Sequence, residues 1–331
     1  SLSYIIDNAV KTGMAPDLMP YIEEDPEWKE QIHPSVFETW EDEQGHLYTI
    51  PDALEWAGYW YNADYLKAAG ITDENGDVKI PRTWSEMIGT AEDIQDWINE
   101  TGQDIAVFSL DKAQITEYLF PVRLAGDGEA GTASAQHPED GIDKGAVERT
   151  VADLGILKSY SRDVDNIESA RQQFCEGKTV FYFNGVWETE AVENSTFSQS
   201  FAYANYPSED GHSISYMSSP SGYILAQQED KRKEEACIRF LKYMLSDEVQ
   251  KKIAFETDQV PCNPKVNNSV AAQSETLFGE AVRTVQAADQ HIKALTSVWE
   301  REKLDVIDTC LIQALDDPQA LGTMVGQLGA K

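Results

Sequence analysis

The feature that most constrains the fold is the alternation of short strand-like segments with helical ones. Four segments are rich in aromatic and β-branched residues, as β-strands are: 46–51, 59–62, 105–110 and 179–185. The segments between them carry helical patterns and helix-capping residues. Strands separated by helices predict α/β sheets with crossover connections, in which ligands bind beyond the strand ends.

Helix ends are marked most clearly in the first half of the chain. A helix is predicted over 64–69, where Gly70 ends it, and a longer one over 84–101, where Thr83 is the N-cap. Glu86 follows at the position of a capping-box partner, which strengthens the prediction of a helix start at this point.

Two helical regions are predicted in the second half, over 231–257 with a break at Ser246, and over 274–312.

Segment 126–131 matches G-x-G-x-x-G, but a dinucleotide site needs a strand before this motif and a helix opening on its third glycine. The residues that follow carry no helical pattern, so a flexible loop is predicted and no nucleotide is expected.

Length and charge restrict the class of protein. The 331 residues exceed one ordinary domain, so two lobes are expected. Asp and Glu total 58 against 26 Lys and Arg, which gives a net charge of −32. A surface this acidic repels phosphate backbones, so we expect no nucleic-acid partner. Neutral ligands are compatible with this charge, and a cationic ligand would suit it.

Cysteine spacing excludes the common metal and redox sites. Cys175, Cys237, Cys262 and Cys310 lie far apart and form no C-x-x-C pair. We expect isolated, mostly buried thiols; one disulfide stays possible, with its pairing open. The acidic turn 73–77 lacks the glycine and glutamate spacing of an EF-hand. We therefore expect no metal and no other cofactor.

Aromatic content is the strongest pointer to a ligand. The chain has eight Trp, fourteen Tyr and eleven Phe. Sugars stack their apolar faces on aromatic rings and need carboxylate or amide partners for their hydroxyls. Four tryptophans stand beside such polar residues: Trp56, Trp60, Trp187 and Trp299. Each is equally compatible with packing in a core, because tryptophan is readily buried.

Five motifs occur in the order and spacing of a known family. They are HLYTIP followed by GYWYNADYLKAAG, PRTWSEM, ARQQFCEGKTVFYFNGVW, PSGYILAQQ and KEEACIRFLKYMLSDEVQKK. With them the chain resembles the family 1 extracellular solute-binding proteins of ABC importers, the maltose-binding-protein-like group. The resemblance implies a two-lobed α/β, periplasmic-binding-protein-like (type II) fold with hinge-linked lobes. The implied first lobe is 1–57 plus 224–270, and the second is 58–223 plus 271–331.

The resemblance also implies the ligand-binding residues. They are Glu55, Trp56, Glu117, Tyr118, Trp187, Gly222, Tyr223 and Trp299. Glu55 is implied to bind sugar hydroxyls, and Trp187 and Trp299 to be stacking platforms. Segment 221–223 is implied to be the return crossing between the lobes. One departure is that family members begin with further strands and a helix of the first lobe, so we expect that lobe to be incomplete here.

The predicted function is that of the substrate-binding subunit of an ABC importer. It would capture a carbohydrate, more readily an oligosaccharide than a monosaccharide, by hinge closure and deliver it to membrane permease subunits. We expect a monomer without enzymatic activity, located in the periplasm or lipid-anchored at the outer face of the cell membrane. Two alternatives stay open: a binding protein for another solute such as a polyamine, and a glycoside hydrolase, which needs two suitably spaced carboxylates.

Overall fold

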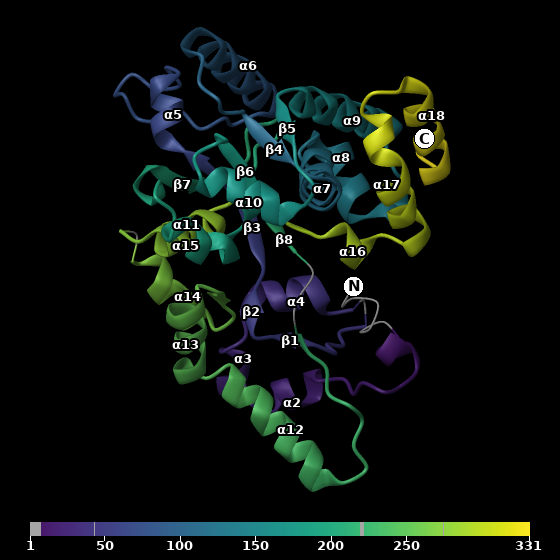
Figure 1. The fold of residues 1–331 in the computed structure, drawn as a ribbon. Helices are drawn as coiled ribbons and strands as arrows, with labels where there is room; N and C mark the ends of the chain where they lie inside the picture. The colour runs from purple at the N-terminus through teal and green to yellow at the C-terminus, as the bar shows by residue number, and fades with distance from the viewer. Residues whose placement is uncertain (1–7, 43, 219–221, 274) are drawn as a thin grey trace. The chain divides into compact units, whose positions relative to one another are not determined.

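The computed structural model describes residues 8–42, 44–218, 222–273 and 275–331. The chain divides into two compact units, each made of two stretches of sequence (Figure 1). Unit 1 is Ser1–Trp56 with Ser218–Arg283, and unit 2 is Ala57–Met217 with Thr284–Lys331. The boundaries of these units, after Trp56, Met217 and Arg283, differ from the lobe boundaries predicted after residues 57, 223 and 270. The assignment of the lobes stays a prediction.

Unit 1 contains helices of four to fourteen residues and two-residue strands. Its helices are α2 (Met19–Glu23), α3 (Pro26–Lys29), α4 (Pro34–Trp40), α12 (Lys231–Met244), α13 (Asp247–Thr257), α14 (Pro264–Ala271) and most of α15 (Leu277–Gln286). Its strands are β1 (Ile50–Pro51), β2 (Ala53–Leu54), β9 (Gly222–Tyr223) and β10 (Val260–Pro261). They form two antiparallel pairs, β1 with β9 and β2 with β10.

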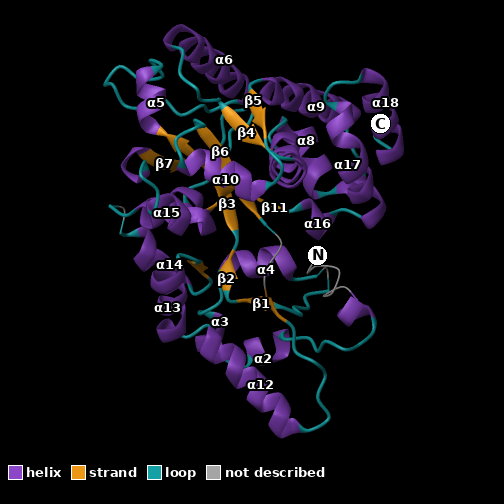
Figure 2. Cartoon of the chain, viewed as in Figure 1, coloured by secondary structure: helices purple, strands orange, loops and turns teal. Residues whose placement is uncertain are grey.

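Unit 2 contains the larger sheet, with helices around its strands (Figure 2). Its strands are β3 (Trp56–Asn62), β4 (Phe108–Leu110), β5 (Ser161–Asp163), β6 (Phe181–Gly185), β7 (Phe201–Ala204), β8 (Ile214–Met217) and β11 (Gln290–Lys293). The α-helices of unit 2 are α5 (Ala63–Ala68), α6 (Trp84–Thr101), α7 (Phe120–Ala125), α8 (Gly128–Gln136), α9 (Lys144–Ser159), α10 (Ile167–Cys175), α11 (Thr189–Glu193), α16 (Leu295–Val298), α17 (Arg301–Ala314) and α18 (Pro318–Leu328). A π-helix, η1 (Gln114–Leu119), and three 3₁₀ turns, η2 (Pro138–Asp140), η3 (Val186–Glu188) and η4 (Ser198–Ser200), complete it.

The central strand of this sheet is β3, which lies between β8 and β6 in the order β11-β8-β3-β6. It also pairs with β7, and its pairings with β6 and β7 are antiparallel. Every residue of β3 is buried, as in strands covered on both faces. Phe108 stacks on Phe181 and on Phe183, with both ring-centroid distances 5.5 Å. These rings of β4 and β6 belong to one core cluster of unit 2, together with Tyr59 and Tyr61 of β3.

The strand prediction over 46–51 is wrong for most of its length, because only Ile50–Pro51 is a strand. The backbone of Leu47 is satisfied otherwise. Its N–H donates to the Asp17 carboxylate and its carbonyl accepts from the Leu18 N–H. Contacts with residues 17 and 18, distant in sequence, therefore replace a strand ladder there. The other three predicted strands are confirmed, two of them in shortened form, as β3, β4 and β6.

Two other segments also differ from prediction. Segment 126–131, expected to be a loop, contains the start of α8. Small residues allow α8 to pack closely on α7: a Cβ added to Gly131 would lie 2.1 Å from the Leu124 carbonyl oxygen. The region 274–312, expected to be helical throughout, contains β11, which pairs in parallel with β8. That strand is a tertiary pairing that helical spacing cannot reveal.

Helix α6 has the predicted bounds and cap. The Thr83 hydroxyl accepts a hydrogen bond from the Glu86 N–H at 3.0 Å, and the Glu86 carboxylate accepts one from the Arg82 N–H at 2.8 Å. Thr83→Ala removes the first of these and is expected to lower the free energy of unfolding by about 1 kcal/mol. Urea denaturation measures this, with Thr83→Ser as the matched control that keeps the hydroxyl. Equal stability of the two variants would contradict the capping role.

A buried ion cluster joins α7, α8 and α9. The Arg123 guanidinium donates to the Asp127 carboxylate at 2.9 Å and to the Asp153 carboxylate at 2.6 Å, and lies 3.3 Å from Glu209. Only 3% of the Arg123 and Asp127 side chains is exposed. Arg149 adds a second cation on Asp127 at 2.6 Å. The cluster fixes these three helices against one another in unit 2.

All four cysteines are free thiols in this structure; the expectation that they are mostly buried is wrong, because Cys262 is buried and the other three are partly exposed. Burial raises the pKa of the Cys262 thiol to about 12. A raised pKa favours the neutral thiol, which is the unreactive form. Native protein is expected to leave Cys262 unmodified by a disulfide reagent, and denatured protein to react at all four. Rapid loss of this thiol from the native state, identified against Cys262→Ala, would contradict its burial.

Candidate functional site

The one predicted stacking residue that the structure leaves partly exposed is Trp187. It follows the end of β6, in the 3₁₀ turn η3. Its six-membered ring lies directly over Gly185: a Cβ built on that glycine would meet ring carbons at 2.1–2.3 Å. Only a residue without a side chain leaves room for the indole in this position.

Two tyrosines extend the aromatic surface next to Trp187. The Tyr118 ring centroid lies 6.4 Å from that of Trp187, with the planes inclined at 42°. Tyr216 of β8 meets Tyr118 edge to face at 5.7 Å. Tyr118 is 9% exposed and Tyr216 is 4% exposed, so Trp187 adjoins a buried tyrosine that itself contacts a second buried tyrosine. We call Tyr118, Trp187 and Tyr216 the aromatic surface of unit 2.

Tyr118 comes from a π-helix, a rare element that often occurs at functional sites. Gln114, at its start, is fully buried. Its side-chain amide donates to the Phe183 carbonyl of β6 at 3.1 Å, and its side-chain oxygen accepts from the Asp111 N–H at 3.2 Å. Gln114 thus ties the element that carries Tyr118 to the strand that leads to Trp187.

Two carboxylates adjoin the aromatic surface in sequence. Glu117 has an exposed side chain, yet the protein around it desolvates its carboxyl, which with the negative charges of Asp111 and Asp308 raises its pKa. Glu188 is buried, and its burial raises the pKa of its carboxyl although Arg171 at 3.6 Å opposes this. Glu117 is therefore the carboxylate free to approach a ligand from this part of unit 2.

Trp299 does not present a face for stacking in this structure. It is 5% exposed, its indole N–H donates to the Ala135 carbonyl at 3.1 Å, and its ring meets Phe120 edge to face at 6.3 Å. Trp56 is 1% exposed and packs against His33 at 5.1 Å. The packing interpretation therefore describes both residues here, because hydrophobic neighbours enclose their rings.

The other predicted residues lie in unit 1 near its crossings to unit 2. Glu55 separates β2 from β3, and its carbonyl accepts from the Ser218 N–H at 2.8 Å. Gly222 pairs with Pro51, where a Cβ would lie 2.5 Å from the Thr49 hydroxyl. Ser221, predicted with it at the return crossing, lies outside the described residues.

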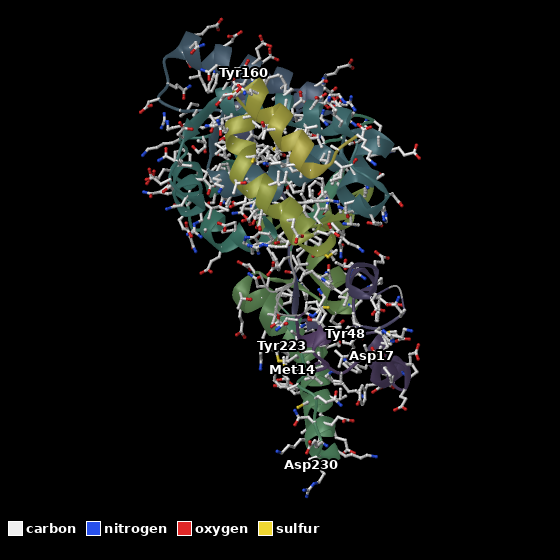
Figure 3. The ribbon with its side chains drawn as sticks, turned by 90° about the vertical axis from the view of Figure 1, so that its right-hand side faces the viewer. Met14, Asp17, Tyr48, Tyr160, Tyr223 and Asp230 are labelled. Atoms are coloured by element: carbon white, nitrogen blue, oxygen red, sulfur yellow. The ribbon has the colours of Figure 1, made fainter. Side chains whose placement is uncertain are left out.

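Tyr223 has structural partners within unit 1. Its hydroxyl donates to the Asp52 carboxylate at 3.0 Å, and its ring meets Phe240 of α12 edge to face at 5.3 Å. Figure 3 labels Tyr223 together with Asp230, the N-cap of that helix. These contacts join β9 to the β1–β2 turn and to α12.

Sequence reasoning missed Tyr216 and Gln114. Tyr216 lies in β8, whose four residues, Ile214–Met217, carry too short a pattern to stand out as a strand. Gln114 functions through a contact with β6 that lies 69 residues away in sequence. Near it in sequence, Asp111 and Gln114 each accept a hydrogen bond from the other's backbone N–H, a pattern that resembles a helix cap.

A partly exposed indole beside a tyrosine, with an exposed carboxylate on the element that carries this tyrosine, suits a flat ligand with hydroxyl groups. Within the described ranges, no cluster of three or more His, Cys, Asp or Glu is arranged to hold a metal. The same ranges contain no helix with the length and apolar character of a membrane span. Fold and surface together define a two-lobed α/β ligand-binding protein.

Residues 3–280 match the sequence model of a family described as bacterial extracellular solute-binding protein. The chain belongs to this family, as its motifs indicated, and its location is accordingly extracytoplasmic. It is 21% identical over 277 residues to a maltooligosaccharide ABC transporter solute-binding lipoprotein of Streptococcus pneumoniae. That match covers 80% of this chain but 61% of the relative, so the chain spans less than two thirds of the curated relative's length.

Solved structures share the fold at low sequence identity. A Streptococcus pneumoniae solute-binding protein in complex with the blood group A-trisaccharide has a TM-score of 0.75 and 21% identity, with 97% of this chain and 80% of that chain covered. A chitin oligosaccharide binding protein has a TM-score of 0.76 and 18% identity, with 98% and 80% covered. These likenesses confirm the two-lobed α/β fold that the motifs implied.

Proposed function

We propose that this protein is the substrate-binding subunit of an ABC importer and captures a carbohydrate, an oligosaccharide rather than a monosaccharide. The observation that carries the proposal is the partly exposed Trp187, which adjoins Tyr118; Tyr118 in turn contacts Tyr216 and is preceded in the chain by the exposed Glu117. Pyranose rings stack on such an indole, and a carboxylate accepts hydrogen bonds from their hydroxyls. The names of the similar proteins point the same way, since they mention maltooligosaccharide, a trisaccharide and chitin oligosaccharide.

The rest of the functional proposal follows from the family. The protein would bind its ligand as a monomer, without turning it over, and deliver it to membrane permease subunits. Lipid anchorage is supported by the lipoprotein name of the Streptococcus pneumoniae relative. Ligand capture between the two lobes by hinge closure stays a prediction.

The test measures binding of neutral oligosaccharides of the malto-, chito- and raffinose series by intrinsic tryptophan fluorescence and thermal shift. A saturable fluorescence change with a higher Tm, and unchanged sugar by chromatography, would support a non-catalytic carbohydrate binder. Release of shorter sugars, or turnover of an aryl glycoside, would indicate a hydrolase instead. Spermidine is the matched cationic probe, because the net charge of −32 suits a cation. A response to spermidine alone would overturn the carbohydrate proposal.

A further inference from the structure

The backbone that carries the Trp187 platform is held by two buried aromatic side chains. The Trp60 indole N–H donates to the Gly185 carbonyl at 3.1 Å. The Tyr203 hydroxyl donates to the Asn184 carbonyl at 3.1 Å and accepts from the Gly58 N–H at 2.5 Å. Side-chain bonds from β3 and β7 thus fix the last two residues of β6. We call Trp60 and Tyr203 the β6 clamp.

The two members of the β6 clamp also support each other. Their ring centroids lie 4.6 Å apart with the planes inclined at 65°, an edge-to-face contact. Trp60 is 0% exposed and Tyr203 is 4% exposed, so both side chains lie within the core of unit 2. Buried hydrogen bonds of this kind rigidify a site because breaking one strands a desolvated donor or acceptor.

The position of the Trp187 indole depends on the backbone of Gly185, because the ring lies directly against it. Gly185 has φ −83° and ψ 178°, an extended conformation open to any residue. Its backbone therefore does not require glycine, whereas the ring of Trp187, which a Cβ would meet at 2.1 Å, does. A shift of the β6 end would move the indole relative to Tyr118 and Tyr216.

We propose that Trp60 and Tyr203 are positioning residues that set the height and tilt of the ligand-stacking indole of Trp187. This inference rests on the proposed function, because it assigns the β6 clamp a role in binding a flat sugar face. A platform fixed before the ligand arrives avoids the entropy cost of ordering it on binding. The β6 clamp would thereby raise affinity without any contact to the sugar.

The test compares two tyrosine-to-phenylalanine variants. Tyr203→Phe removes the hydroxyl that bonds Asn184 and Gly58 and is expected to raise the Kd for the best oligosaccharide by about fivefold. Tyr206→Phe is the matched control, since Tyr206 is 0% exposed and its hydroxyl has no hydrogen-bond partner within the described part of the chain. This control is expected to leave Kd unchanged.

Fluorine NMR of fluorotryptophan-labelled protein reads the indole directly. The Trp187 resonance, assigned by its loss in Trp187→Phe, is expected to shift or broaden in Tyr203→Phe and not in Tyr206→Phe. Gly185→Ala is a second route to the same displacement, because its Cβ would occupy space held by the ring. An unmoved Trp187 resonance in both Tyr203→Phe and Gly185→Ala would overturn the proposal.

A double-mutant cycle separates positioning from a general structural effect. In a Trp187→Ala background, Tyr203→Phe is expected to cause no further loss of affinity, because no indole remains to be positioned. An equal loss in both backgrounds would overturn the inference. If the parent protein bound no carbohydrate, the proposed function would fail, while the NMR comparison would still decide whether the β6 clamp sets the indole.

Discussion

Replacing Trp187 with alanine is expected to raise the Kd for the bound oligosaccharide by about tenfold to a hundredfold. Burying a large aromatic side chain contributes about 1.5–3 kcal/mol, and about 1.4 kcal/mol corresponds to a tenfold change in Kd. Because Trp187 is partly exposed and follows the end of β6, its removal should leave the core of unit 2 intact. Isothermal titration calorimetry measures the affinity, and the thermal transition checks the fold.

Trp187→Phe and Trp97→Ala are the controls for this substitution. Phenylalanine keeps a smaller stacking face and should recover part of the affinity. Trp97 is also partly exposed, but it lies on α6 beside Tyr65, at a ring-centroid distance of 5.9 Å. Its replacement is expected to leave Kd unchanged. Full affinity in Trp187→Ala would remove this residue from the site and with it the main structural support for carbohydrate binding.

Arg123→Met is expected to cause the largest loss of stability, about 3–5 kcal/mol, which corresponds to a fall in Tm of roughly 6–20 °C. Methionine matches much of the volume but leaves Asp153 without its cation and Asp127 with only Arg149. A buried carboxylate that loses its partner is much more costly than a surface one. Calorimetric unfolding at neutral pH measures the effect.

Arg301→Met is the matched control for the buried cluster. Its partner Asp305 is 58% exposed and Arg301 itself is 71% exposed, so solvent screens the pair. The expected loss is below about 1 kcal/mol. Equal effects of Arg123→Met and Arg301→Met would show that the cluster does not stabilise the fold. The sugar affinity of Arg123→Met, measured well below its Tm, is expected to match the parent, since Arg123 does not contact the aromatic surface.

Much of the fold could be read from local patterns. The N-cap Thr83 and the span of α6 follow from side chains that satisfy helix-end N–H groups, and Gly70 ends a helix at positive φ. Ser246 likewise divides α12 from α13. Such features were predictable because their causes lie within a few residues. Strand β11 and helix α8 were not, since β11 exists through pairing with β8, and α8 through close packing on α7.

The candidate site, too, was predictable from the sequence only in part. The sequence by itself determined the family, through motifs in a fixed order, and indicated an aromatic ligand site that includes Trp187 and Tyr118. Only the tertiary structure decided which aromatic rings are available. It encloses Trp299 and Trp56, leaves Trp187 partly exposed, and packs Tyr216, from an unpredicted strand, as a buried neighbour of Tyr118. Burial depends on which distant segments pack around a ring, and residue type and local spacing carry no record of those neighbours.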